Sequence, residues 1–202
     1  MNDQDNLRCP VNLERIQRAS KAVGFQMASD LLTGSLLRTL VATKPAGTFL
    51  ELGTGTGVAT AWILDGMDQQ SQLISIEQDP IVIAVAQEYL GQDHRVTFYH
   101  GDAGAWLPKA EDERFDLIFA DTWAGKYWQL EDALRLLKLG GLYIIDDMLP
   151  QATWPEGHEP RVRELISALE SKPELIITKM NWSTGIIVAT KVARREETAI
   201  YQ

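Results

Sequence analysis

The sequence predicts an α/β fold, a Rossmann-like, doubly wound, mostly parallel sheet of seven strands with helices on both faces. Short apolar runs alternate with segments of helical periodicity along most of the chain. This alternation is typical of βαβ units, whose right-handed crossovers make successive strands parallel. A glycine-rich turn follows the first strand, and acids follow the next four strands. A C-terminal hairpin supplies one antiparallel strand.

The expected elements are placed by hydrophobic period and by turn residues. The expected strands are 48–52, 72–77, 95–100, 115–120, 142–145, 174–180 and 185–190. The expected helices are 11–23, 31–41, 58–64, 80–90, 103–107, 128–139 and 160–169. Ser29 or Asp30 caps the second helix, and Pro80 occupies a tolerated first-turn position. Gly140 and Gly141 are expected to close the helix over 128–139.

One domain is expected for residues 1–202, because no linker, repeat or low-complexity segment divides the chain. Residues 1–45 form an N-terminal helical cap, either over one end of the sheet or as a lid over a ligand. Residues 46–192 form the sheet core, which is expected to hold the ligand.

Charge and composition restrict the partners. The net charge of -9 argues against nucleic acid, because phosphate binding relies on clustered Lys and Arg. No apolar run approaches the roughly 20 residues of a membrane span, and no signal-peptide pattern is visible. The single Cys9 cannot form an internal disulfide, which fits a reducing compartment. We expect a cytoplasmic protein with a small-molecule substrate and no membrane partner, and we leave a homodimer open.

The glycine-rich turn lies in residues 49–57, Phe-Leu-Glu-Leu-Gly-Thr-Gly-Thr-Gly. Glycine lets the backbone approach a ligand closely, and the following helix offers free N–H groups to polar ligand atoms. The dinucleotide fingerprint is broken, because Val58 stands where its third glycine belongs. The P-loop pattern is also absent. The turn therefore predicts a nucleotide-like ligand of another kind.

Acids gather at the carboxyl ends of the predicted strands, where open α/β sheets bind ligands. They are Glu77, Asp102, Asp121 and the pair Asp146–Asp147. Glu77 lies about 20 residues after the glycines, where an acid accepts hydrogen bonds from ribose hydroxyls. The edge predicts a cationic ligand, a ligand with hydroxyl and amino donors, or a metal.

These motifs together resemble class I S-adenosylmethionine-dependent methyltransferases, over about residues 30–192. Segments 115–121 and 139–147 look most like the catechol and caffeoyl-CoA types of O-methyltransferase. The resemblance implies S-adenosylmethionine as cofactor, with its methionine part beside Gly53, Gly55 and Gly57. It also implies contacts to the cofactor from Glu51 at the amino group, Glu77 at the ribose, Asp102 and Ala103 at the adenine, and Asp121. For Glu51 and Asp102 the alternative is a turn or helix-cap acid.

The resemblance also raises the question of a metal. In the divalent-metal members, the acid after strand four and an Asp-Asn pair after strand five bind Mg²⁺. Here Asp121 and Asp146 match, and Asp147 replaces the asparagine. Two hypotheses stand: these three acids hold Mg²⁺, which prefers oxygen ligands, or they cap strand ends and contact the cofactor indirectly.

The catalytic candidates are Asp121, Lys126 and His158. The family pattern has a lysine three residues after the first metal acid, and this chain has Ala124 there. Lys126 and His158 are the substitutes, and each is otherwise a surface residue. Trp123 and Trp154 are candidates for walls that stack a planar acceptor.

The predicted function is methyl transfer from S-adenosylmethionine to a hydroxyl of a small acceptor, with an aromatic acceptor favoured. Two alternatives stay open. One is a protein that binds S-adenosylmethionine without transferring its methyl group. The other is a nicotinamide-dependent dehydrogenase, against which the glycine spacing and the terminal hairpin count.

Overall fold

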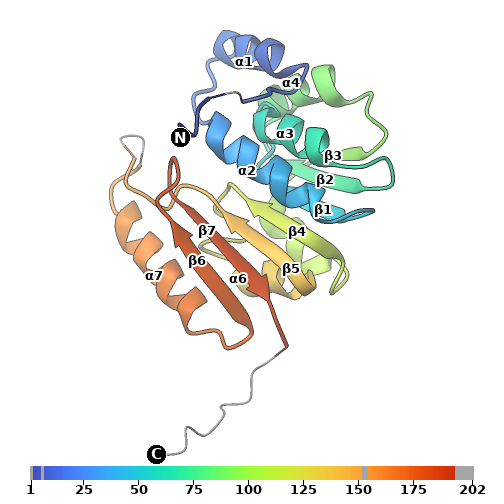
Figure 1. The fold of residues 1–202 in the computed structure, drawn as a ribbon. Coiled ribbons are helices and arrows are strands. Elements are labelled where there is room, and N and C mark those ends of the chain that lie inside the picture. Colours follow the sequence, from blue (N-terminus) through green and yellow to red (C-terminus); the bar gives the residue numbers. More distant parts are fainter. Residues whose placement is uncertain (1, 6, 152–153, 194–202) are drawn as a thin grey trace, which may run out of the picture.

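A seven-stranded sheet in the order β3-β2-β1-β4-β5-β7-β6 forms the centre of the computed structural model (Figure 1). The structure describes residues 2–5, 7–151 and 154–193. The strands are β1 (Thr48–Leu52), β2 (Gln72–Glu77), β3 (Val96–His100), β4 (Phe115–Ala120), β5 (Leu137–Ile145), β6 (Leu175–Met180) and β7 (Ile186–Lys191). β7 runs antiparallel to both neighbours and the other pairs are parallel. The predicted fold class is confirmed.

Helices cover the two faces of the sheet and bury a separate apolar cluster on each. The first face packs against α1 (Leu13–Ala22), α2 (Leu31–Ala42), α3 (Val58–Gly66) and the end of α4 (Pro80–Leu90). The second packs against α5 (Ala103–Trp106), the short turn Leu107–Lys109, α6 (Leu130–Arg135) and α7 (His158–Glu170). Because side chains alternate along a strand, Phe49 faces the first layer and Leu50 the second.

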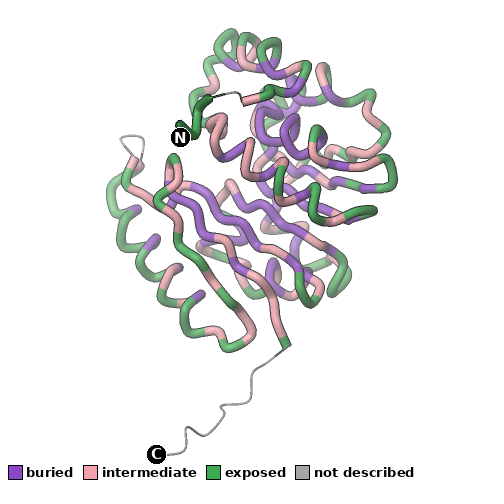
Figure 2. Tube along the Cα trace, in the orientation of Figure 1, coloured by how far each residue is buried: buried purple, intermediate pink, exposed green. Residues whose placement is uncertain are grey.

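Burial is greatest in the middle of the sheet and least in its edge strands (Figure 2). β1 and β4 are buried over most of their length, as expected for parallel strands covered on both faces. β3 and β6, at the two edges, are mostly exposed or half-buried. The central strands therefore give a rigid base to the ligand edge.

The N-terminal segment packs on the sheet layer and also reaches the ligand edge. Asp30, rather than Ser29, caps α2 and accepts hydrogen bonds from the N–H groups of Leu32 and Thr33 at 2.7 and 3.1 Å. This leaves Ser29 free to point toward β4. No helix among the described ranges is long and apolar enough to cross a membrane.

The helix predicted over 128–139 is wrong. Helix α6 spans only Leu130–Arg135, and the strand that was expected to begin at residue 142 begins at Leu137. Leu137 is fully buried and pairs with Phe115 of β4, across an irregularity in the register. Apolar residues at this spacing suit a short helix and a buried strand equally, and pairing with β4 decides for the strand.

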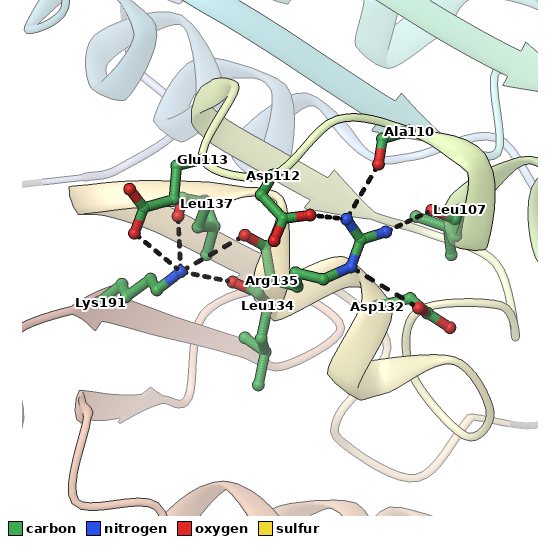
Figure 3. A network of polar contacts seen from close by, with 9 residues as sticks. All are labelled: Leu107, Ala110, Asp112, Glu113, Asp132, Leu134, Arg135, Leu137 and Lys191. Carbon is green, nitrogen blue, oxygen red and sulfur yellow. Dashed lines mark hydrogen bonds and ion pairs between the residues drawn. The ribbon is translucent and has the colours of Figure 1, made fainter.

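A polar network fixes the point where α6 ends (Figure 3). Lys191 of β7 donates hydrogen bonds to the carbonyl oxygens of Leu134 and Leu137, at 3.1 and 2.8 Å. Arg135 donates to the carbonyls of Leu107 and Ala110, at 3.1 and 2.9 Å. The bond from Lys191 satisfies the carbonyl of Leu134 at the end of α6, and the bonds from Arg135 tie that end to the short turn Leu107–Lys109 and to Ala110. The chain can therefore leave the helix and enter β5.

Candidate functional site

A cavity of about 570 Å³ lies at the carboxyl ends of β1, β4 and β5. Its lining comes from the segment 25–30, the glycine loop, the ends of β2, β4 and β5, and the start of α7. A second hollow of about 400 Å³ leads from it toward residues 101–103. Gly53, Glu77 and Trp123 border both spaces. The size is that of a typical small-molecule site.

The first glycine of the loop faces this cavity. Gly53 has φ +97°, and a Cβ there would lie 2.7 Å from the carbonyl oxygen of Asp121. The ends of β1 and β4 can approach so closely only because residue 53 is glycine. The N–H of Gly55 donates a hydrogen bond to Glu77.

The third glycine of the loop has a packing role. Gly57, the N-cap of α3, has φ +91°. A Cβ there would lie 2.9 Å from the Cβ of Ala86, so Gly57 faces α4 and not the cavity. In the dinucleotide fingerprint the third glycine allows close packing of the helix. Here Gly57 allows close packing of α3 against α4.

Glu51 is fully buried and points toward α3. Its Oε2 accepts hydrogen bonds from the hydroxyls of Thr60 and Ser75, and Ser75 lies 2.6 Å from the hydroxyl of Thr54 in the glycine loop. Its Oε1 has no hydrogen-bond partner among the described residues. Burial raises the pKa of Glu51 to about 7. Glu51 therefore reaches the loop only through Ser75 and Thr54.

Glu77 and Asp102 border the smaller hollow, as does Ala103. Glu77 Oε1 accepts hydrogen bonds from the backbone N–H groups of Gln78 and Asp79, at 2.9 and 3.0 Å. Asp102 caps α5 through a bond from the N–H of Gly104 at 2.8 Å. Asp102 is thus a helix cap, and it also lines the smaller hollow.

Asp121, after β4, and Asp146, after β5, both line the larger cavity, and each accepts hydrogen bonds from other residues of the protein. Asp121 Oδ2 accepts a hydrogen bond from Ser29 at 2.9 Å. Asp146, 2% exposed, accepts through Oδ1 from the hydroxyl of Thr184 and, at 2.8 Å, from the N–H of Asp147. Burial, and next the nearby Asp146, raise the pKa of Asp121 well above its ordinary value. Burial raises the pKa of Asp146 to about 6.

Lys126 lies among these acids. It is 5% exposed, and its Nζ donates a hydrogen bond to the carbonyl oxygen of Asp146 at 2.9 Å and lies 3.9 Å from Asp121 Oδ1. The surface alternative for Lys126 is therefore wrong. Within residues 2–5, 7–151 and 154–193, no three His, Cys, Asp or Glu are grouped so that they could hold a metal ion. The arrangement of Asp121 and Asp146 around a lysine does not fit a resident Mg²⁺.

An aromatic cluster closes the other side of the cavity. It consists of Trp123, Tyr127, Trp154 and His158, all of which line the cavity. The ring of His158 lies 4.6 Å from that of Trp154 and 5.2 Å from that of Tyr127. His158 Nε2 is 2.9 Å from the hydroxyl of Tyr127.

The expected loop position of His158 is wrong. This residue begins α7 and is 6% exposed. Burial lowers the pKa of its imidazole, which favours the neutral ring.

Two residues of the site were missed by sequence reasoning, Ser29 and Thr184. Ser29 is 92 positions from its partner Asp121, and Thr184 is 38 positions from Asp146. Serine and threonine in loops carry no signal that distinguishes such roles. The segment 25–30 could have been suspected only because it joins two helices that precede the glycine loop.

Residues 8–192 match the family described as O-methyltransferase. The chain belongs to the O-methyltransferase family. A catechol O-methyltransferase from Niastella koreensis is 33% identical over 123 residues, or 57% of this chain and 56% of that protein. A Mycolicibacterium vanbaalenii protein named "Putative O-methyltransferase" is 30% identical over 168 residues, 78% of this chain and 74% of that protein.

A further relative and two solved structures are similar to this O-methyltransferase family member. A Mycobacterium sp. (strain KMS) protein of the same name is 27% identical over 143 residues, and the matched region spans 65% of its length. Among solved structures, a Klebsiella pneumoniae protein of that name has a TM-score of 0.80 at 28% identity, covering 91% and 90% of the chains. The Bacillus cereus O-methyltransferase in complex with SAH shares the fold at a TM-score of 0.82, 20% identity and 94% coverage of both chains.

Proposed function

We propose that this protein transfers the methyl group of S-adenosylmethionine to a hydroxyl of a small aromatic acceptor. The observation that carries the proposal is that two neighbouring hollows with different linings share a border. A carboxylate-bordered hollow next to the glycine loop opens, past Trp123, into a cavity with an aromatic wall. A donor and an acceptor could thus meet end to end.

The residues of the glycine loop and the smaller hollow fit the cofactor. Gly53 lines both spaces, and its lack of a Cβ lets the backbone of the loop pack against Asp121 at the edge of the cavity. Glu77 would accept hydrogen bonds from the ribose hydroxyls and Asp102 from the adenine amine, with Ala103 beside the ring. When bound, S-adenosylmethionine supplies an activated methyl group on a positively charged sulfur. The Bacillus cereus relative binds SAH with the same fold.

The aromatic cluster suits a planar acceptor. The rings of Trp123, Trp154 and His158 lie at an angle to one another in one wall of the cavity. An aromatic acceptor can therefore contact them in the offset or edge-on geometry that aromatic rings prefer. In the reaction the acceptor oxygen would take the methyl group, S-adenosylhomocysteine would leave with the electron pair of the broken carbon–sulfur bond, and the hydroxyl proton would pass to the neutral imidazole of His158. The protein's part is to align oxygen and methyl group and to exclude water. Asp121, Lys126 and His158 line the cavity where the oxygen would lie.

Two measurements test the proposal in sequence. Calorimetry with S-adenosylmethionine and S-adenosylhomocysteine should detect binding, and NADH should not displace either ligand. A panel of phenols and catechols should then yield a methylated product by mass spectrometry. Binding without product from any phenol would favour the non-transferring alternative. Binding of NADH, with no binding of S-adenosylmethionine, would favour the dehydrogenase.

A further inference from the structure

We propose that the Lys126 ammonium takes the place of a divalent cation at the carboxyl ends of β4 and β5, so that methyl transfer proceeds without a metal. The inference concerns the same site as the proposed function and rests on it. Its metal-binding part can be tested whether or not an acceptor is found.

The first ground is the position of the lysine. Its Nζ lies within 2.9 Å of the Asp146 carbonyl oxygen and 3.9 Å of Asp121 Oδ1. Lysine is seldom buried unless it is paired, and this one is 5% exposed. Lys126 is the one lysine among the described residues that line the cavity. A positive charge is therefore already present between the two strand ends.

The second ground is the use of the carboxylate oxygens. Asp121 Oδ2 is bonded to the Ser29 hydroxyl, and Asp146 Oδ1 accepts from both Thr184 and the N–H of Asp147. Magnesium demands near-octahedral oxygen ligation at about 2.1 Å. Here one oxygen of Asp121 and one of Asp146 serve hydroxyl or amide donors, and an ammonium lies beside the other oxygen of Asp121. A metal held by the remaining oxygens would lie next to a like charge, because the ammonium is already 3.9 Å from Asp121 Oδ1.

The third ground is the backbone of this edge. Asp147 has φ +61°, a left-handed conformation that costs energy for a residue other than glycine. In this conformation its N–H turns back onto the carboxylate of Asp146 at 2.8 Å. The turn therefore supplies a donor to Oδ1 of Asp146, one of the candidate metal ligands.

The ammonium can orient an acceptor as a metal would. It carries three N–H donors, of which one serves the Asp146 carbonyl. Another donor is available to the acceptor oxygen, which becomes more negative as its proton leaves. Lys126 would therefore hold the oxygen and stabilise its charge, while Asp121 keeps the ammonium in place. This role needs the lysine in its charged form throughout.

The experiment compares metal binding by three forms of the full chain, each saturated with S-adenosylhomocysteine. Wild type, Lys126→Ala and Lys126→Met are titrated with Mg²⁺ alone by calorimetry, and melting temperatures are taken with a chelator and with Mg²⁺. Wild type should bind no Mg²⁺ at millimolar concentration and should melt at the same temperature in both conditions. Lys126→Ala should gain Mg²⁺ binding and a Mg²⁺-dependent rise in melting temperature, because the strand ends lose the ammonium that lies 3.9 Å from Asp121 Oδ1. Lys109→Ala, at an exposed lysine, is the matched control and should behave as wild type.

Activity gives an independent readout once a methylated acceptor is known. Wild-type rates with a chelator and with Mg²⁺ should agree within about twofold, while Lys126→Met should lose at least about tenfold. Lys126→Met keeps the buried stem, so it separates the loss of charge from a loss of packing.

Mg²⁺ binding by wild type, or a chelator-sensitive rate restored by Mg²⁺, would overturn the proposal. If neither lysine variant folds, the wild-type titration alone decides it. A chain that fails to bind S-adenosylhomocysteine would refute the proposed function, and the Mg²⁺ titration would still decide whether the edge holds a metal.

Discussion

The carboxylate of Glu77 accepts a hydrogen bond from the backbone N–H of Gly55, with 3.0 Å between Oε2 and N. This bond joins the end of β2 to the middle of the glycine loop. Its other oxygen, Oε1, is bonded to two N–H groups at the start of the next turn. One side chain thus sets the position of the loop and borders the hollow proposed for the ribose.

Substitution of Glu77 should weaken cofactor binding strongly. Glu77→Gln should raise the Kd for S-adenosylhomocysteine by about 10- to 100-fold, because hydrogen bonds to a charged group are worth about 1.5–3 kcal/mol. Calorimetry measures the effect. Glu88→Gln, at an exposed position on α4, is the control and should leave the Kd unchanged. Equal Kd values for the Glu77 variant and wild type would remove Glu77 from the cofactor site.

The first and third glycines of the loop should respond differently to alanine. Gly57→Ala puts a methyl group against Ala86 and should lower the free energy of unfolding by about 2 kcal/mol, with little effect on cofactor affinity. Gly53→Ala should reduce affinity at least about tenfold, because the backbone of Asp121 must move and the cavity changes shape. Urea unfolding and calorimetry on both variants separate the effects. Loss of affinity in Gly57→Ala without loss of stability would contradict the packing role.

Glu51 should make stability depend on pH in a defined window. Its folded-state pKa of about 7 exceeds its ordinary value of 4.5, so the folded protein binds the proton more tightly. The free energy of unfolding therefore falls as pH rises from 4.5 to 7, by about 3 kcal/mol from this group. Glu51→Gln should lack this fall.

The measurement is urea unfolding of wild type and Glu51→Gln at pH values below and above the window. The stability of the variant relative to wild type should be higher above the window than below it. Other titrating groups cancel in this comparison. A difference that does not change with pH would show that Glu51 titrates normally.

The pair Tyr127 and His158 should affect the acceptor rather than the cofactor. Tyr127→Phe removes the hydroxyl that lies 2.9 Å from His158 Nε2, so the imidazole loses a partner that fixes its orientation. We expect kcat/KM for the acceptor to fall about fivefold to tenfold, with the Kd for S-adenosylhomocysteine unchanged. Steady-state kinetics and calorimetry provide the two readouts. A change in cofactor affinity alone would place this pair outside the acceptor site.

The sequence allowed the ligand edge to be predicted because its signals are local. Parallel strands end at one edge, so an acid after each strand and glycines after the first can be assigned to that edge without any structure. Gly53, Glu77 and Asp121 all line the cavity as this reasoning requires.

The other properties of the site depend on distant contacts. Lys126 is buried because the turn after β4 folds back toward β5. The spacing of residues in the sequence does not predict this turn. Glu51 follows the same pattern as the other acids, yet strand alternation turns it toward α3. The segment 128–139 shows the corresponding limit for the fold, since its leucines fit a helix and a buried strand equally.

The antiparallel strand β7 has a consequence for the order in which the site can form during synthesis. It is the last strand of the part of the chain that the structure describes, yet it lies between β5 and β6, and the turn before it carries Thr184, which binds Asp146. A nascent chain that has been made only as far as α7 already contains the glycine loop, Glu77 and Asp102. Its β5 still lacks one neighbour, and Asp146 lacks its hydroxyl partner. The proposed donor half can therefore assemble on the ribosome before the acceptor half does.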